Sequence, residues 1–472
     1  MTSVSARSLA LLLDGWRDAA APAYVALADR IRLLVLDGRI SIDTRLPAER
    51  DLAAQLDLSR TTVSATYAEL REGGFLSSVR GSGSVARLPH RGIPAADQPE
   101  PGYLDFTKAS MQAIPALADA ARRAAEQLPA YLGDSGFDPI GLPVLRAALA
   151  ARYTARGLPT DPEQIMVTIG AQHAIALLSR TLLSRGDRAL VETPSYPHAY
   201  EALKNAGARL VPVTVTSDEG WDELGLEQAI QRTSPSLGYL MPDFHNPTGR
   251  SMSAELREHT LGLAARHGTM LIADETMAEL AIDDVEPVLP FAAYGDAILI
   301  GSVGKTVWGG VRVGWIRAER NVIQRLVRTR SAGDLGTPIL EQLVVANLLP
   351  ELDGILATRK AQLKDGRDWM LRLLAERIPE WEVPSPAGGI TTWINLGAPV
   401  SSQLAIAARS QGLQIAAGPR FGIDGAFERF IRVPFGQPRA EIERGVDALA
   451  AAWATVGRHP MQVDTGYLAE VV

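Results

Sequence analysis

Between residues 142 and 300, helix-length runs of apolar residues alternate with shorter apolar runs that are typical of buried strands. Parallel strands need a long crossover connection, and that connection is usually a helix. The alternation therefore predicts an α/β architecture in which helices cover a mainly parallel sheet. The predicted helices are 142–155, 171–183, 196–205 and 252–267, and the predicted strands are 165–168, 188–191, 210–215, 237–241, 270–273 and 297–300.

A different pattern follows in residues 345–458, where long helices are mixed with isolated strands such as 390–395 and 430–433. This pattern predicts a smaller α+β lobe. A chain of 472 residues exceeds what one hydrophobic core usually organises, so its length predicts two to four domains.

The composition excludes several classes of protein. Hydrophobic residues make up 46% of the chain and charged residues 21%, and no run of about 18 apolar residues could cross a bilayer. The N-terminus lacks the pattern of a secretory signal, and the absence of cysteine excludes disulfides, thiolate metal sites and thiol nucleophiles. We therefore expect a cytoplasmic protein with no membrane partner and no metal site. The net charge of −7 argues against binding nucleic acid over the whole surface, although it can hide a local basic face.

The N-terminal segment carries three predicted helices followed by a hairpin. Apolar residues recur at helical spacing over residues 24–36, and Pro47 is suited to open a second helix that ends at Leu56. Ser59 can cap a third helix, which runs to about Glu72. Two short strands follow, joined by a turn in which glycines can take positive φ. This order predicts a winged helix-turn-helix.

The domain boundaries follow from these patterns. The linker lacks hydrophobic periodicity and is rich in proline and glycine. We expect a winged helix-turn-helix at 1–88, a linker at 89–103, an α/β and α+β domain at 104–458, and a C-terminal tail at 459–472.

Three motifs in the N-terminal segment closely resemble the GntR-type DNA-binding domain over about residues 20–88. The motifs are Leu46-Pro47-Ala48-Glu49-Arg50, Ser59-Arg60-Thr61-Thr62-Val63 and Arg80-Gly81-Ser82-Gly83. In such a domain the third helix enters the major groove of double-stranded DNA by its N-terminal end. Arg60 and Thr61 would then reach bases or phosphates, Arg50 and Thr62 would set the register on the backbone, and Arg80, Gly81 and Gly83 would approach phosphates or the minor groove. The other interpretation is a protein-docking module.

A second group of residues has the chemistry of a pyridoxal phosphate site. Only five lysines occur in the chain, and Lys305 alone lies in a glycine-rich, apolar setting, just after the predicted strand 297–300. Its amine would lie at the carboxyl end of a strand, where open α/β sheets form their sites. Asp274 ends the predicted strand 270–273, and a buried carboxylate there needs a cationic partner such as a pyridinium. A lysine for the imine and a carboxylate on the pyridine nitrogen are what this cofactor requires.

Further residues match the other parts of such a site. Asn246 can donate to the 3′ oxygen of the cofactor, and Tyr196 can stack on its ring. The candidate phosphate ligands are the side chains of Ser302 and Arg312 and the strand-to-helix turn formed by Gly170, Ala171 and Gln172. Each motif alone also occurs in ordinary turns and helix caps, so the prediction depends on their order and spacing.

That order resembles the fold type I aminotransferases throughout about residues 104–458. The resemblance implies that Lys305 is the imine lysine and that Arg432 is the clamp for the carboxylate of a substrate or effector. His198, two residues after Tyr196, is a further candidate contact for the effector. The chain departs from the aminotransferase pattern at one point. Many relatives carry a tyrosine two or three residues after the aspartate, whereas Thr276 and Met277 stand there in this chain.

Together the two resemblances point to the MocR subfamily, which are GntR-type regulators with an aminotransferase-like effector domain. They imply a head-to-tail homodimer that senses an amine or amino acid through an external aldimine formed by displacing Lys305. Two other interpretations stay open. One is a working aminotransferase that its N-terminal domain merely tethers, because fold does not fix function. The other is a scaffold that never binds the cofactor, which the retained site residues disfavour.

Overall fold

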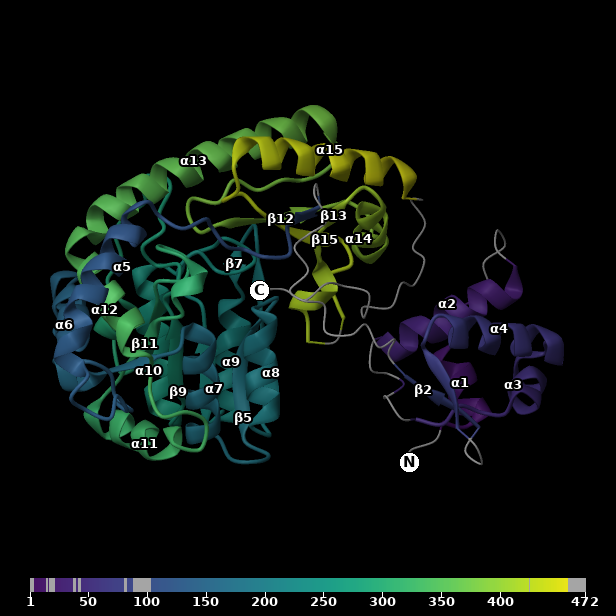
Figure 1. Ribbon diagram of the computed structural model, residues 1–472, viewed down its shortest axis with the longest axis horizontal. Helices are drawn as coiled ribbons and strands as arrows, with labels where there is room; N and C mark the ends of the chain where they lie inside the picture. The colour runs from purple at the N-terminus through teal and green to yellow at the C-terminus, as the bar shows by residue number, and fades with distance from the viewer. Residues whose placement is uncertain are drawn as a thin grey trace.

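The computed structural model describes residues 4–13, 16, 22–36, 40, 44–79, 83–87, 103–423 and 425–456. Within these residues, no helix is both long enough and apolar enough to cross a membrane. The chain forms a small N-terminal unit, a large lobe and a small lobe (Figure 1).

The N-terminal unit is a helical core with a two-stranded wing. Its elements are α1 (Ala6–Leu12), α2 (Ala23–Leu36), α3 (Glu49–Leu56), α4 (Arg60–Glu72), β1 (Leu76–Val79) and β2 (Gly83–Ala86), the two strands being antiparallel. Ser59 caps α4 by accepting a hydrogen bond from the Thr62 amide, as predicted. Buried Leu27, Leu52 and Val63 pack the helices together.

Three details of this unit differ from the sequence prediction. Helix α3 begins at Glu49 instead of Pro47, because Ala48 is still in an extended conformation. Helix α1 was not predicted. Of the predicted wing turn, Arg80 and Gly81 lie outside the described residues, whereas Gly83 has a φ of 79°. That left-handed value favours glycine over other residues.

The large lobe is built on an eight-stranded sheet with the strand order β4-β11-β10-β9-β8-β5-β6-β7. Strands β10, β9, β8, β5 and β6 run parallel, whereas β11 is antiparallel to both of its neighbours and β7 is antiparallel to β6. The mainly parallel sheet is thus confirmed, and the antiparallel β11 was not predicted. The strands are β4 (Ile165–Thr168), β5 (Arg188–Thr193), β6 (Arg209–Thr216), β7 (Gly220–Trp221), β8 (Leu237–Leu240), β9 (Met270–Asp274), β10 (Ile298–Ser302) and β11 (Gly314–Arg317).

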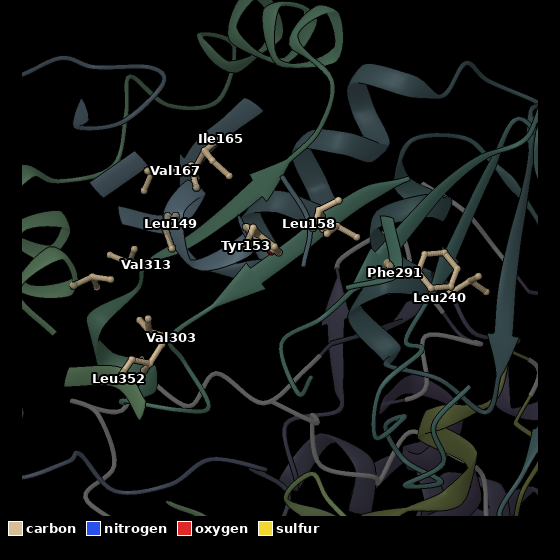
Figure 2. Close-up of a cluster of buried hydrophobic side chains, with 14 of the residues drawn as sticks. Leu149, Tyr153, Leu158, Ile165, Val167, Leu240, Phe291, Val303, Val313 and Leu352 are labelled. Atoms are coloured by element: carbon tan, nitrogen blue, oxygen red, sulfur yellow. The ribbon is translucent and has the colours of Figure 1, made fainter. Parts of the chain in front are cut away.

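Helices cover this sheet, and two hydrophobic clusters join them to it. In one cluster, Leu149 and Tyr153 of a helix meet Ile165 and Val167 of β4 (Figure 2). The wholly buried central strands explain why their sequences are continuous apolar runs. The helices of this lobe are α5 (Ala116–Gln127), α6 (Pro143–Ala155), α7 (Ala171–Leu182), α8 (Pro197–Asn205), α9 (Glu223–Thr233), α10 (Ala254–His267), α11 (Arg320–Arg330) and α12 (Ile339–Leu348), and short 3-10 turns occur at Leu128–Tyr131, Pro162–Gln164, Phe291–Ala293, Gly309–Val311 and Leu349–Glu351.

The small lobe is the predicted α+β unit. Helix α13 arches across the top of the molecule and packs beside α15 over a three-stranded sheet of order β12-β15-β14 (Figure 1). Strand β3, the next described element after β2, pairs in parallel with β13 and so joins this lobe. The elements are β3 (Leu104–Asp105), α13 (Leu352–Arg377), β12 (Thr391–Asn395), α14 (Ser401–Ser410), β13 (Leu413–Gln414), β14 (Ala416–Ala417), a 3-10 turn (Gly418–Phe421), β15 (Phe430–Pro434) and α15 (Arg439–Thr455).

One buried arginine connects four parts of the large lobe. Arg330, at the end of α11, is fully buried and donates to the carbonyl oxygens of Pro139 and Val167 at 2.8 and 2.7 Å. It also donates to the Thr337 hydroxyl at 3.1 Å and to the Asp334 carboxylate at 2.7 Å. Burying this charge is tolerable because its donors are matched by oxygens.

We therefore expect Arg330→Ala to lower the free energy of unfolding by about 3–5 kcal/mol, since it leaves several buried acceptors without a donor. Urea unfolding followed by circular dichroism measures this loss. Arg122→Ala is the matched control, because Arg122 is exposed and pairs with Asp119 and Glu126 on its own helix. That control should cost less than about 1 kcal/mol. Equal losses in the two variants would contradict the role given to Arg330.

Candidate functional site

A cavity of about 340 Å³ lies at the carboxyl ends of the parallel strands. Its walls come from the segments that follow β4, β5, β8, β9 and β10, together with the loop after β3 and one residue of β15. The predicted site residues on its lining are Ala171, Gln172, Tyr196, Asn246, Asp274, Ser302, Lys305, Arg312 and Arg432. Segments that are far apart in sequence thus meet in one place, where open α/β sheets form their sites.

Asp274 is the buried anion of this cavity. It ends β9, is only 5% exposed, and accepts hydrogen bonds from the Tyr239 hydroxyl at 2.7 Å and the Thr276 amide at 3.0 Å. Burial raises the pKa of Asp274, although the hydrogen bonds from Tyr239 and Thr276 and the charge of Lys305 oppose the rise. A protonated pyridine nitrogen against this carboxylate would favour its charged form.

Lys305 follows β10 by three residues and lies in the same cavity. Its amine donates to the carbonyl oxygen of Ala109 at 2.5 Å. Burial, and then the positive charge of Arg432, lower the pKa of Lys305 to about 8, while Asp274 acts in the opposite direction. A lowered pKa increases the fraction of neutral amine, which is the nucleophilic form needed to attack a carbonyl carbon.

A second part of the cavity is suited to a phosphate. Helix α7 begins at Ala171 with Gly170 as its N-cap, and glycine has no side chain to bond the first amides of the helix. Arg312 approaches closely, since a Cβ on Gly170 would lie 3.0 Å from its guanidinium. Ser302 lies beside them at the end of β10. Helix amides, a guanidinium and a hydroxyl together are the usual ligands of a phosphate group.

Asn246 and Tyr196 line the remaining wall beside the two charged groups. The side-chain oxygen of Asn246 is buried and has no hydrogen-bond partner among the described residues. Buried polar atoms are normally satisfied, so an unpartnered amide facing a cavity favours a polar ligand there. Burial, and then the charge of Asp274, raise the pKa of Tyr196 to about 12, so its phenol stays neutral.

Thr276 and Met277, which stand where the resemblance to the aminotransferases implies a tyrosine, both line the cavity. Thr276 is bound to Asp274 through both its amide and its side chain. Met277 is 7% exposed and can donate no hydrogen bond. Neither residue therefore replaces the missing phenol, and Asn246 is left as the candidate donor to a 3′ oxygen.

Arg432 is a third cation at this cavity, after Lys305 and Arg312, and it has no carboxylate partner among the described residues. It lies on β15, is fully buried, donates to the carbonyl oxygen of Thr107, and has its guanidinium carbon 5.1 Å from the ring centre of Phe421. Its Nε has no hydrogen-bond partner in the described part of the chain. Burial lowers the pKa of Arg432 to about 9, which still leaves the guanidinium charged at neutral pH. A buried guanidinium of this kind is suited to an incoming carboxylate.

Two predicted residues lie at the margin of the cavity. Gly170 supports the helix start and is not on the described lining, and His198 also lies outside it. The His198 ring is 5.2 Å from that of Tyr196, edge to face, and its Nδ1 is 3.2 Å from the Glu201 carboxylate. His198 therefore contacts Tyr196, which does line the cavity, and its predicted contact with an effector stays a prediction.

The helix-turn-helix presents its predicted DNA contacts at the start of α4. Arg60 is exposed, and the hydroxyls of Thr61 and Thr62 both lie 2.7 Å from that of Ser59. Arg50 on α3 is 87% exposed at its side chain. Sequence reasoning missed Arg45, whose guanidinium lies next to Gly83 of the wing. The two residues are far apart in the chain, so no local pattern signals that proximity.

Sequence reasoning also missed Tyr239, which holds Asp274, and Trp308, which lines the cavity three residues after Lys305. Tyr239 lies inside the buried strand β8, where an aromatic residue is expected for packing alone. Only the pairing of β8 with β9 places its hydroxyl against the carboxylate.

Comparison with known proteins connects the two parts of the chain. Residues 105–449 match the aminotransferase class I and II family, and residues 23–85 match the gntR family of bacterial regulatory proteins. The chain is 31% identical over 402 residues to the probable rhizopine catabolism regulatory protein MocR of Rhizobium meliloti, covering 78% of this chain and 77% of that protein. The chain belongs to the MocR subfamily of GntR-type transcriptional regulators.

Other relatives agree with this MocR assignment. The HTH-type transcriptional regulator YisV of Bacillus subtilis is 27% identical over 484 residues, covering 93% of this chain and 98% of that protein. Among solved structures, the α-aminoadipate aminotransferase LysN of Thermus thermophilus matches with a TM-score of 0.68 and 29% identity, covering 75% of this chain and 92% of that one. An archaeal alanine:glyoxylate aminotransferase matches with a TM-score of 0.69 and 26% identity, covering 75% and 91%.

This MocR-type chain therefore combines a DNA-binding GntR domain with an aminotransferase-like domain whose cofactor is pyridoxal 5′-phosphate. The residues present fit that group: a buried carboxylate, a lysine of lowered pKa, an asparagine side chain on the cavity wall that can donate through its amide nitrogen, and a glycine-capped helix start beside an arginine. When bound, the cofactor supplies an aldehyde that captures primary amines and a ring that withdraws electrons from them.

We expect Tyr239→Phe to weaken the binding of pyridoxal phosphate by about tenfold, because a hydrogen bond to a charged group contributes roughly 1.5–3 kcal/mol. The affinity is measured by absorption during equilibrium dialysis of the full chain against the cofactor. Tyr153→Phe is the matched control, since that buried hydroxyl contacts Trp315 and not Asp274. Equal affinity in the two variants would refute a role for Tyr239 at the carboxylate.

Proposed function

We propose that this MocR-type regulator senses an amine or amino acid in the cavity around Lys305 and changes its affinity for an operator accordingly. The observation that carries this proposal is the presence of Lys305, Asp274 and Arg432 in one buried cavity of a chain that also carries a GntR domain. Because its target is DNA, we place its action in the cytoplasm. The division into 1–88, 89–103, 104–458 and 459–472 is part of the same proposal.

In this proposal each cavity residue has a defined role. Lys305 holds the cofactor and yields it to the amine of the effector, Asp274 balances the charge of the pyridine ring, and Arg432 receives a carboxylate. Asn246 and Tyr196 orient the cofactor ring. The phosphate ligands are Gly170, Ala171, Gln172, Ser302 and Arg312.

Arg432 also offers a route from the cavity toward the linker. It donates to the carbonyl oxygen of Thr107, and Thr107 lies two residues after β3, the first described element after the linker. An effector carboxylate would compete with this carbonyl for the guanidinium. A ligand shifts an equilibrium only through differential binding to two states, and this competition supplies such a difference.

The proposal includes a homodimer. Leu132, Phe137 and Leu335 are large apolar side chains that are 70%, 68% and 54% exposed. Their segments are adjacent, because a Cβ on Gly336 would collide with the carbonyl oxygen of Asp138. Exposed apolar clusters of this kind mark contact surfaces, and we propose that a second copy, arranged head to tail, covers this one.

A working aminotransferase is the second candidate function. It is favoured by the two solved relatives described above, both of which are named as aminotransferases, and by the complete set of Lys305, Asp274 and Arg432. The absence of a phenol at Met277 favours sensing over turnover.

The test is the absorption spectrum of the cofactor-loaded protein during titration with amino acids and amines. A shifted band that persists supports a sensor, whereas conversion to pyridoxamine phosphate with release of a keto acid supports an enzyme.

We expect Lys305→Ala to abolish the effect of the effector on DNA binding while leaving a folded dimer that still binds DNA. The covalent anchor is lost, but Lys305 lies in the effector domain, where its amine contacts Ala109. Fluorescence anisotropy of a labelled operator, with and without effector, measures the response, and sedimentation checks the dimer. A full response in Lys305→Ala would rule out the proposed sensing chemistry.

We expect Arg60→Ala to weaken operator binding about 10- to 100-fold, because a base or phosphate contact at the start of a recognition helix contributes roughly 1–3 kcal/mol. The control is Arg7→Ala, which removes the same charge from an exposed position on α1 in the same domain. Anisotropy at two salt concentrations separates a phosphate contact from a base contact. Unchanged affinity in Arg60→Ala would mean that α4 is not the recognition helix.

A further inference from the structure

We infer that the effector is an amino acid with an uncharged, apolar side chain, recognised by a wall of methionine and aromatic side chains in the Lys305 cavity. This inference rests on the proposed function and narrows it to one chemical class of ligand. It depends on two observations, which are the absence of an unassigned charge on the described cavity lining and the composition of the remaining wall.

Every charged side chain on the described lining already has a partner or a role. Asp274, Lys305 and Arg312 surround the proposed cofactor position, and Arg432 is assigned to the carboxylate of the effector. The remaining charge is Asp243, which is 5% exposed.

Asp243 is neutralised by its own partner. The guanidinium of Arg257 donates to it at 2.6 Å, and Arg257 is fully buried. Arg257 also donates to the carbonyl oxygens of Met252 and Pro242, so its position is fixed. A pair held in this way offers no free charge to a ligand.

The rest of the wall is largely apolar. Met111 comes from the loop after β3, Met241 and Phe244 from the segment after β8, and Met277 from the segment after β9. These four side chains are between 6% and 7% exposed. Methionine is flexible and polarisable, so three methionines can adapt to apolar side chains of different shape. Ser110, Gln172 and Thr276 add uncharged polar groups only.

Trp308 is the most accessible part of this wall. It is 43% exposed and lines the cavity, and its ring lies against Gly310, where a Cβ would collide with the indole. Exposed tryptophan beside a cavity is suited to cover an apolar ligand.

The charge distribution disfavours the other classes of side chain. A second carboxylate would be desolvated against methionine and phenylalanine with no described cation left to pair with it. A basic side chain would enter a cavity that already holds Lys305, Arg312 and Arg432. An aliphatic side chain, in contrast, strengthens binding about fourfold for each additional methylene that it buries.

The test is a spectral titration of the full-length, cofactor-loaded protein with glycine, leucine, methionine, glutamate and lysine. We expect leucine and methionine to bind at least tenfold more tightly than glycine, and glutamate and lysine to bind more weakly than leucine. Tighter binding of glutamate or lysine, or equal binding of glycine and leucine, would overturn the inference. If none of the five amino acids changes the spectrum, the proposed sensing function itself is overturned. That outcome is distinct from a reversed order of affinities, which would overturn only the inference about the side chain.

Two variants test the wall directly. Trp308→Ala and the nearly isosteric Met111→Gln should each lower the affinity for leucine about tenfold and leave the affinity for glycine unchanged, because glycine has no side chain to contact the wall. A purely structural effect would weaken both ligands equally. Trp453→Ala is the matched control, since Trp453 packs against Trp381 in the small lobe. The readout is the ratio of the affinity for leucine to that for glycine. If this ratio is unchanged from the parent protein in all three variants, the inference is overturned.

Discussion

The parallel pairing of β8, β9 and β10 is the constraint on which the rest of the site depends. It aligns Ile298 with Ile272 and Leu237 with Met270, so that the three strands end at the same edge of the sheet. Asp274 therefore ends β9 with the Tyr239 hydroxyl on one side and the segment that carries Lys305 on the other. Because these strands are buried on both faces, a shift of their register would expose apolar side chains and scatter the site.

Burial gives the cavity its chemistry. The same low-polarity surroundings lower the pKa of the Lys305 amine and raise that of the Asp274 carboxyl. Both shifts favour the uncharged form of the group. Arg432 stays charged, and among the described residues it contacts a carbonyl oxygen and the ring of Phe421 but no carboxylate. Buried Asp274 and Arg432 would therefore interact strongly with a ligand that carries a charge opposite to their own. Arg50 and Arg60, which are proposed to face DNA, are exposed, so a contact of theirs with phosphates would be sensitive to salt.

The segment around β3 belongs to the small lobe and also reaches the cavity. Strand β3 follows the linker and pairs with β13, while Thr107, just beyond it, accepts a hydrogen bond from Arg432 in the cavity. The first residues of the effector domain thus contribute to the wall of the site that is proposed to bind the ligand. In the proposed sensor the loop after β3 would contact the ligand, so no long pathway between sensing and response would be needed.

The sequence by itself determined the fold class and most strands of the large sheet, because buried parallel strands and helix caps leave local patterns. The candidate cofactor residues came from the order of motifs that resembles the aminotransferases. The strand 165–168 was predicted to the residue, and Ser59 was identified as the cap of α4. Tertiary structure alone decided that β11 runs antiparallel between β4 and β10, that Tyr239 holds Asp274, and that His198 lies outside the described cavity lining. These features depend on contacts between residues far apart in the chain, and such contacts leave no periodicity in a single sequence.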